Sequence, residues 1–277
     1  SIGMLVVSIL PLYGLRDYRC TQKSLCEIQE YKEVSSIDEA FSEGVTAGNI
    51  RLLYINQDNH ADGVPTTYGT SIGGQLKYET AKWNHVSLAA SAFVSQKING
   101  LSGDHAKNEL NLDVFGENGN SFAYIGEAYV DYSYKQFDMR IGRQKLDTPM
   151  NDRDDIRMLP NTFEALMLGY GGIKDFVFVG GYIQRWAGYD SGADISMFKD
   201  MPGGVDTDNN ARKGVILAGV MNESLENIEL QAWYYDFDKV AGVTYLDALY
   251  AAEYKNGLNV ETGVQLGNYS ESSSSGV

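Results

Sequence analysis

The 277-residue chain has few basic residues, few prolines and almost no cysteine. Its 22 Lys and Arg face 37 Asp and Glu, which gives a formal net charge of −15 at pH 7. This deficit of positive charge argues against a nucleic-acid-binding protein, because such proteins present a basic surface to phosphates. Apart from an apolar stretch over residues 2–14 there is no long hydrophobic run, which excludes a bundle of membrane-spanning helices.

Glycine and tyrosine are abundant instead, and the chain has the pattern of successive strands. It contains 30 Gly and 19 Tyr against 5 Pro, and hydrophobic residues make up 43% of it. This composition favours a folded protein that is rich in β-strands. Runs of alternating apolar and polar residues predict eleven strands, at about 46–56, 69–81, 85–98, 122–134, 136–146, 162–173, 175–188, 212–222, 226–237, 241–255 and 258–269.

The connections between these strands alternate between short and long. Short turns are predicted at 82–84, 135–136, 173–175, 222–226 and 255–257, and long connections at 57–68, 99–121, 147–161 and 189–211. One exception is the short connection at 238–240, which falls where a long one is due. An up-and-down membrane barrel has this asymmetry, with tight periplasmic turns and long outer loops. A soluble sandwich with Greek-key crossovers has no reason to show it.

The predicted strands have one apolar face and one polar face. In 85–98, Leu88 and Val94 alternate with Ser91 and Ser95, and Phe93 is an exception on the polar face. The apolar face would be the core of a sandwich, whereas in an outer-membrane barrel it faces lipid and the polar face lines water. Strand length, turn asymmetry and possible interfacial girdles of aromatic residues favour the barrel. The aromatic residues in question are Tyr78, Trp83, Tyr132, Tyr134, Tyr182, Trp186, Tyr234, Tyr235, Tyr250 and Tyr254.

The N-terminal segment, residues 1–35, is atypical. Its apolar stretch resembles the hydrophobic region of a secretory signal peptide without the basic start, and a buried strand is the alternative. Cys20 and Cys26 follow, and two cysteines at this spacing could form a disulfide in an oxidising periplasm. We expect the barrel domain to comprise residues 36–277.

The densest charged run begins at the end of strand 136–146 and continues through the connection that follows. Two interpretations are open: a solvated loop tip, or a loop folded into a pore where its charges select solutes. Arg140 shares a face with Asp138 and is predicted to face the lumen, whereas strict alternation points Arg143 outward unless a bulge or the rim re-aims it. The candidate constriction residues are Arg140, Arg143, Lys145, Asp147, Asp152, Arg153, Asp154, Asp155 and Arg157, and the weaker lumen candidates are Lys77, Glu127, Asp131 and Arg185.

The motif IGRQKLDT at 141–148 is followed by Asp154, Asp155, Arg157 and MLPNTFE at 158–164. In this part the sequence closely resembles the OprD-type porin family of Gram-negative outer membranes. Residues 36–58, SIDEAFSEGVTAGNIRLLYINQD, resemble the mature N-terminus of the family, particularly the versions in Campylobacter-like bacteria. The similarity extends from about residue 36 to the end of the chain.

The resemblance implies an 18-stranded barrel that passes small hydrophilic solutes, often carboxylates or amino acids, through a pore narrowed by inward loops and lined by basic residues. It favours the lumen interpretation of the charged run and an outer-membrane location, in contact with lipid and lipopolysaccharide. A second copy of the chain is a further candidate partner. The predicted strands are about 11 of an expected 18, so we expect a C-terminally truncated fragment that cannot form a working pore alone.

No catalytic site and no cofactor are predicted. The three histidines, His60, His85 and His105, are isolated, and motifs for nucleophilic or phosphate chemistry are missing, so we do not expect an enzyme. Asp206 and Asp208 resemble half of a calcium loop without its Gly and later Glu, so a solvated loop or a loosely bound divalent cation is expected there. Two other classes stay open: an outer-membrane barrel with an adhesin or structural role, and a secreted soluble β-protein.

Overall fold

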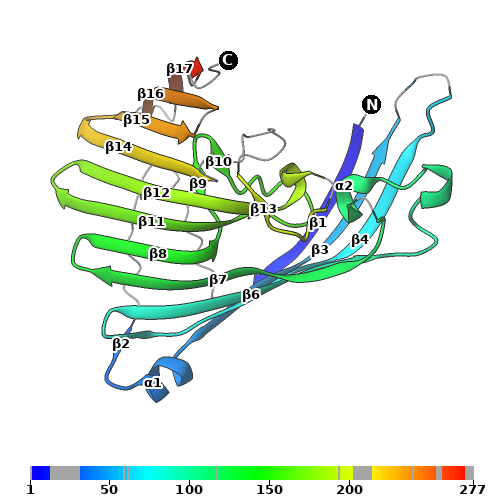
Figure 1. Cartoon of the computed structure of the whole chain (residues 1–277), viewed down its shortest axis with the longest axis horizontal. Helices are drawn as coiled ribbons and strands as arrows, with labels where there is room; N and C mark the ends of the chain where they lie inside the picture. Colours follow the sequence, from blue (N-terminus) through cyan, green and yellow to red (C-terminus); the bar gives the residue numbers. More distant parts are fainter. Residues whose placement is uncertain are drawn as a thin grey trace, which may run out of the picture.

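The computed structural model describes residues 2–12, 32–58, 60, 63–116, 118–192, 194–201, 214–238, 240–253 and 258–271. Most of these residues belong to one curved sheet, whose long strands all pair antiparallel (Figure 1). Neighbouring strands follow the order β1-β3-β4-β6-β7-β8-β11-β12-β14-β15-β16-β17. Their bounds are β1 Ile2–Leu12, β3 Val45–Gln57, β4 Thr67–Glu79, β6 Val86–Lys97, β7 Phe122–Tyr134, β8 Phe137–Gln144, β11 Thr162–Ile173, β12 Phe176–Ala187, β14 Val215–Leu225, β15 Ile228–Phe237, β16 Ala241–Glu253 and β17 Asn259–Glu271.

Shorter elements lie at the ends of these strands and in the connections. They are β2 Glu33–Val34, α1 Ile37–Ser42, β5 Lys82–Trp83, η1 His105–Lys107, α2 Leu112–Phe115, β9 Asp147–Thr148, β10 Asn151–Asp152, η2 Tyr189–Ser191 and β13 Lys199–Asp200. In the described part of the chain, no helix has the length and apolar character needed to cross a membrane.

All eleven predicted strands are present, each end within three residues of its predicted position. The tight turns that join them contain residues with positive φ, as hairpin turns require: Asn84 at 49°, Lys135 at 54°, Asp175 at 63° and Asn227 at 62°. Long connections join the strands at the other end, and 238–240 remains the short exception. The predicted alternation of short and long connections is therefore confirmed.

The two faces of the sheet have the polarity of a membrane barrel. In β6, every second residue from Ser87 to Ser95 is buried, whereas Leu88 between them is 43% exposed. The convex side of the sheet exposes apolar side chains from nearly every long strand: Ile50, Leu76, Leu88, Ile125, Ile141, Leu168, Phe178, Ile216, Leu230 and Leu246. A soluble protein would bury this surface, whereas a barrel in lipid exposes it. The arrangement supports a transmembrane barrel fold and argues against a secreted soluble β-protein.

The N-terminal apolar stretch is a strand in the structure. Residues 2–12 of this stretch form β1, which pairs antiparallel with β3, so the alternative interpretation as a strand describes their conformation. Residues 13 and 14 lie outside the described residues. The signal-peptide interpretation stays a prediction, because a pairing pattern does not test secretion. Cys20 and Cys26 lie outside the described residues, so their predicted disulfide is untested.

Helix α1 begins with a capping box at the tight-turn end of the sheet. The Ser36 hydroxyl accepts a hydrogen bond from the Glu39 amide at 3.2 Å, and the Glu39 carboxylate accepts one from the Ser35 amide at 3.0 Å. The Ser35 hydroxyl donates to the same carboxylate at 2.9 Å, and the two hydrogen bonds from Ser35 lower the pKa of the Glu39 carboxyl. The Tyr78 hydroxyl of β4 donates to the Phe41 carbonyl, which joins the helix to the sheet.

Three long connections pack against the concave face of the sheet, where Figure 1 shows β9, β10 and β13. One cluster joins Leu53 of β3 and Phe93 of β6 to Val114, Phe115, Met158 and Leu159 of two connections. A second cluster joins Leu146 and Met201 to inward residues of β11, β12, β14, β15 and β16. Phe93 breaks the polar pattern of its strand because it packs beneath these inward connections.

The aromatic residues near strand ends divide between the two faces. Trp83, Tyr134 and Tyr234 are exposed, as an interfacial girdle requires. Tyr235, however, is fully buried in the second inner cluster, and Trp186 stacks on Phe163 at 6.1 Å between ring centroids. The girdle interpretation is therefore wrong for Tyr235 and Trp186, because the inward connections need large apolar partners on the concave face.

Candidate functional site

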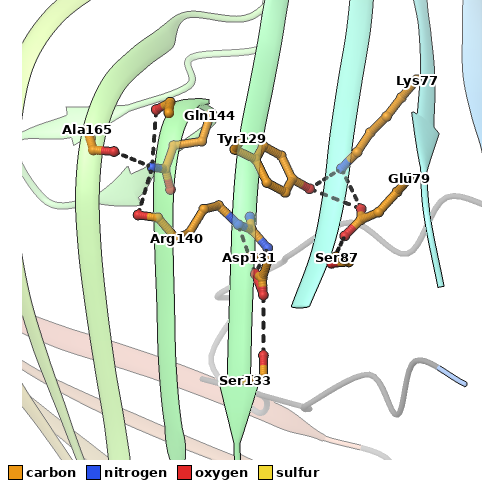
Figure 2. A network of polar contacts seen from close by, with 10 residues as sticks. Lys77, Glu79, Ser87, Tyr129, Asp131, Ser133, Arg140, Gln144 and Ala165 are labelled. Carbon is orange, nitrogen blue, oxygen red and sulfur yellow. Dashed lines mark hydrogen bonds and ion pairs between the residues drawn. The ribbon is translucent and has the colours of Figure 1, made fainter. Parts of the chain in front are cut away.

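A polar network crosses the inner faces of β4, β6 and β7 (Figure 2). The Lys77 ammonium donates to the Tyr129 hydroxyl at 2.6 Å and lies 3.1 Å from the Glu79 carboxylate. Tyr129 in turn donates to Glu79 at 3.0 Å, and the Ser87 hydroxyl donates to the same carboxylate at 3.3 Å. Four side chains from three strands thus hold one another in place on the concave face.

An ion pair continues this network onto β8. Arg140 donates to Asp131 from Nη2 at 2.8 Å and from Nε at 3.1 Å, and the Ser133 hydroxyl donates to Asp131 at 3.2 Å. The guanidinium carbon lies 4.2 Å from the centre of the Tyr129 ring, a cation–π contact. Figure 2 shows Arg140 and Tyr129 on the same side of the sheet. The structure therefore places Arg140 on the inner face, as its position in the alternation predicted.

The charged run after β8 folds back over the concave face instead of projecting away from the barrel. Within it, β9 and β10 pair as a short hairpin, and the Arg153 guanidinium contacts Asp147 at 3.1 Å. The Arg153 amide also donates to the Leu146 carbonyl at 2.8 Å. Lys145 lies 3.8 Å from Glu127 of β7, a residue that is 4% exposed. The loop charges are thus paired with each other and with the inner wall.

A further ion pair attaches the distal part of this connection to β3, near the N-terminal edge of the sheet. Arg51 of β3 contacts both carboxylate oxygens of Asp155, at 2.5 and 2.6 Å, and donates to the Arg157 carbonyl at 3.2 Å. The Arg157 guanidinium lies 4.6 Å from the centre of the Tyr189 ring. Arg51 was not among the predicted site residues, although it shares a strand face with Leu53 and Ile55, which is the inner face of β3.

Arg143 lies beside a backbone irregularity. Gly142 has φ +126°, a conformation that favours glycine, while the pairing of β8 with β7 and β11 stays in regular register. Arg143 contacts Glu164 at 2.9 Å, and its guanidinium lies 4.3 Å from the Phe198 ring of the β12–β14 connection. Arg185 contacts the other oxygen of Glu164 at 2.5 Å. Strict alternation would have pointed Arg143 outward, yet its guanidinium contacts Phe198 of an inward connection.

Asp154 lies in an acidic part of the connection. Burial and the nearby Asp190 raise the pKa of the Asp154 carboxyl above its usual value. Asn161 donates to Asp190 from Nδ2 at 2.6 Å, and the Asp154 amide donates to Asp152 at 2.8 Å. These contacts link the connection after β8 to the one after β12.

The inner wall and the charged connection border a half-open cavity of about 470 Å³. It is lined by five of the predicted constriction residues, namely Arg140, Lys145, Asp147, Asp152 and Arg153, and by three of the weaker candidates, Lys77, Glu127 and Asp131. The predicted residues Arg143, Asp154, Asp155, Arg157 and Arg185 do not line it. A volume of this size suits a small organic solute.

Three acidic residues in the cavity wall, Asp138, Glu229 and Asp247, were not among the predicted site residues. Glu229 belongs to β15 and Asp247 to β16, toward the C-terminal edge of the sheet. The network in Figure 2 lies on β4, β6, β7 and β8, on the other side of the same cavity. Their signal in the sequence was the alternation itself, because Glu229 and Gln231 occupy the polar face of the predicted strand 226–237. Pairing across the sheet, which the sequence does not reveal, brings Asp247 opposite Gln231.

Within the described ranges, no group of three or more His, Cys, Asp or Glu side chains could hold a metal ion. Asp206 and Asp208, the weak divalent-cation candidates, lie outside the described residues.

Comparisons with known proteins agree with this geometry. A model of the outer membrane porin, OprD family, matches residues 39–276. Pseudomonas aeruginosa OccK8 (OprE) is similar in structure, with a TM-score of 0.66 and 18% identity over 84% of this chain and 55% of that chain. For P. aeruginosa OccK9 (OpdG) the TM-score is 0.69, with 17% identity over 83% of this chain and 59% of that one.

Acinetobacter baumannii OccAB1 has a TM-score of 0.64 and 16% identity, covering 86% of this chain and 54% of that chain. The chain thus spans little more than half the length of these three solved structures. No curated protein matches the sequence.

Proposed function

The chain belongs to the OprD family of outer membrane porins, and on that premise we propose that it forms the wall of a passive channel for small hydrophilic solutes such as amino acids and small carboxylates. Family membership makes it a protein of the Gram-negative outer membrane. The single observation that carries the proposal is the cavity of about 470 Å³, which is bounded by lumen-facing charges on one side and an inward connection on the other.

The charges of this cavity support selection by sign. Arg140, Lys145 and Arg153 all line it, and each contacts a carboxylate that fixes its position. In a narrow pore with low-dielectric walls, fixed charges act on a passing ion more strongly than they would in water. Guanidinium groups also match the geometry of a carboxylate. We propose that these three residues contact the carboxylate of the solute as it passes through the pore.

Bilayer electrophysiology of the full-length protein tests this assignment. In an Arg140→Gln/Arg153→Gln double variant we expect the reversal potential in a salt gradient to move toward cation selectivity, and propionate conductance to fall. The matched control is Lys174→Gln, because Lys174 lies in the tight turn between β11 and β12 and its side chain is 91% exposed. If the double variant has the same ion selectivity as the unmodified channel, the assignment is wrong. The charged connection is then a solvated loop that does not select solutes.

The surroundings of the channel follow from its location. Family membership places the barrel in the outer membrane, and we propose that its acidic long connections contact lipopolysaccharide phosphates through divalent cations. We also propose that the protein acts as a passive channel and not as an enzyme. A second copy of the chain is a candidate partner in the membrane.

A further inference from the structure

The connection between β12 and β14 is attached to the strand from which it starts. Its short strand β13 pairs with the end of β12, where Asp200 lies opposite Arg185. The Met201 amide donates to the Gln184 carbonyl at 2.9 Å, and the Met201 side chain is buried in the second inner cluster. These contacts fix residues 199–201 beside β12.

Phe198, the residue before β13, contacts a different part of the wall. Its ring meets the ring of Tyr124 of β7 edge to face, with 6.4 Å between the centroids, and Tyr124 packs in turn on Phe93 of the first inner cluster at 5.5 Å. The guanidinium carbon of Arg143 of β8 lies 4.3 Å from the centre of the Phe198 ring. Because β8 and β11 lie between β7 and β12 in the strand order, Phe198 extends the connection across two strands.

The Arg143 guanidinium is held in place for this contact. Its Nε donates to Glu164 at 2.9 Å, and its Nη1 donates to the Ile125 carbonyl at 3.2 Å. Hydrogen bonds at the edge of a guanidinium leave its flat face available to an aromatic ring. Arg185 contacts the other oxygen of Glu164 at 2.5 Å, so this carboxylate keeps a cationic partner if Arg143 is replaced. Arg143 does not line the central cavity.

We propose that the contact between Arg143 and Phe198 holds the β12–β14 connection across the concave face, which makes Arg143 a positioning residue that does not touch the solute. This inference rests on the concave face being the wall of the proposed channel. It assigns to Arg143 a role that depends on its flat face and its hydrogen bonds. A lumen charge that acts on the solute would instead depend on its net charge alone.

The first test measures trypsin cleavage of the folded full-length protein in detergent micelles. Lys199 follows Phe198 directly, so the rate of cleavage after Lys199 reports how often this part of the connection opens. In Phe198→Leu and in Arg143→Met this rate should rise about two- to fivefold, the factor that corresponds to a partly exposed cation–π contact. Phe198→Trp, which keeps an aromatic face, should restore the rate of the unmodified protein. Each rate is divided by that of the same variant after unfolding, which corrects for the altered cleavage sequence.

The second test separates a positioning role from a charge effect. In planar bilayers, Phe198→Leu should make brief closures of the channel more frequent while the reversal potential in a salt gradient stays unchanged. The Phe198→Leu/Arg143→Met double variant should be cleaved no faster than either single variant, because both substitutions remove the same contact. The matched control is Phe176→Leu, which removes a ring that stacks on Phe178 on the convex face.

A heat-modifiable band checks that each variant has folded. An unchanged cleavage rate in Phe198→Leu would overturn the inference, and so would additive effects of the two substitutions. A shifted reversal potential in Arg143→Met, with cleavage after Lys199 unchanged, would make Arg143 a lumen charge instead. Cleavage is measured without a solute, so these outcomes are independent of the Arg140→Gln/Arg153→Gln experiment that tests the proposed function.

Discussion

Individual charges on the concave face are held by partners from distant parts of the sequence. Arg51 and Asp155 are 104 residues apart, yet they form a bidentate ion pair. The Arg51 side chain in this pair is only 12% exposed. Such a pair has a defined geometry, unlike the exposed contact between Lys32 and Glu43. We conclude that Arg51 positions the charged connection across the concave face.

This conclusion predicts the effect of removing the ion pair. Arg51→Gln and Asp155→Asn should each release the distal part of the connection, so single-channel currents should become noisier and the mean conductance should rise. The double variant should lose little more unfolding free energy than either single variant. The coupling free energy between the two residues should be about 1 kcal/mol. Lys32→Gln, which breaks an exposed pair, is the control. Strictly additive effects of the two substitutions would contradict a positioning role.

At the scale of the element, the sequence predicted the strands and the lengths of the connections well, and the structure within the connections poorly. All eleven strands were predictable because alternation has a fixed period of two and tight turns have a recognisable chemistry. The hairpin of β9 and β10 was not predictable, because its four residues are too few to show periodicity. Arg51 and Asp247 were missed for a related reason, since alternation gives the face of a strand but not which residues lie opposite it.

The outward face of the strands carries its own prediction. Ile72 of β4 is 44% exposed on the convex side near the middle of its strand, so Ile72→Arg would place a charge against lipid. We expect this variant to lose about 2–4 kcal/mol of unfolding free energy in lipid vesicles, the cost of an arginine near the bilayer midplane. Leu101→Arg is the matched control, because Leu101 is exposed in a long connection. Equal stability of the two variants would contradict the assignment of the convex face to lipid.

At the scale of the whole molecule, the net charge of −15 raises the question of where the negative charge lies. Acidic residues recur in the long connections 57–68, 99–121 and 189–211, which join strand ends opposite to the tight turns. Divalent cations would lower the repulsion among these charges. We predict that a chelator increases proteolysis of the long connections in outer-membrane vesicles while the barrel stays heat-modifiable. Proteolysis that is insensitive to chelator would contradict the proposed bridging.

The central claim is that the concave face lines water and the convex face contacts lipid. On β15 and β16, Gln231 and Asp247 line the cavity, while their neighbours Leu230 and Leu246 are exposed on the other face. The most direct test replaces Cys20 and Cys26 by Ser and then introduces a single cysteine at each of these four positions.

The measurement is the single-channel current during addition of a water-soluble, positively charged thiol reagent. We predict stepwise current changes for Gln231→Cys and Asp247→Cys, because their thiols would lie in the water-filled lumen, and no change for Leu230→Cys and Leu246→Cys. Current changes at the two leucine positions with none at Gln231 and Asp247 would contradict the account.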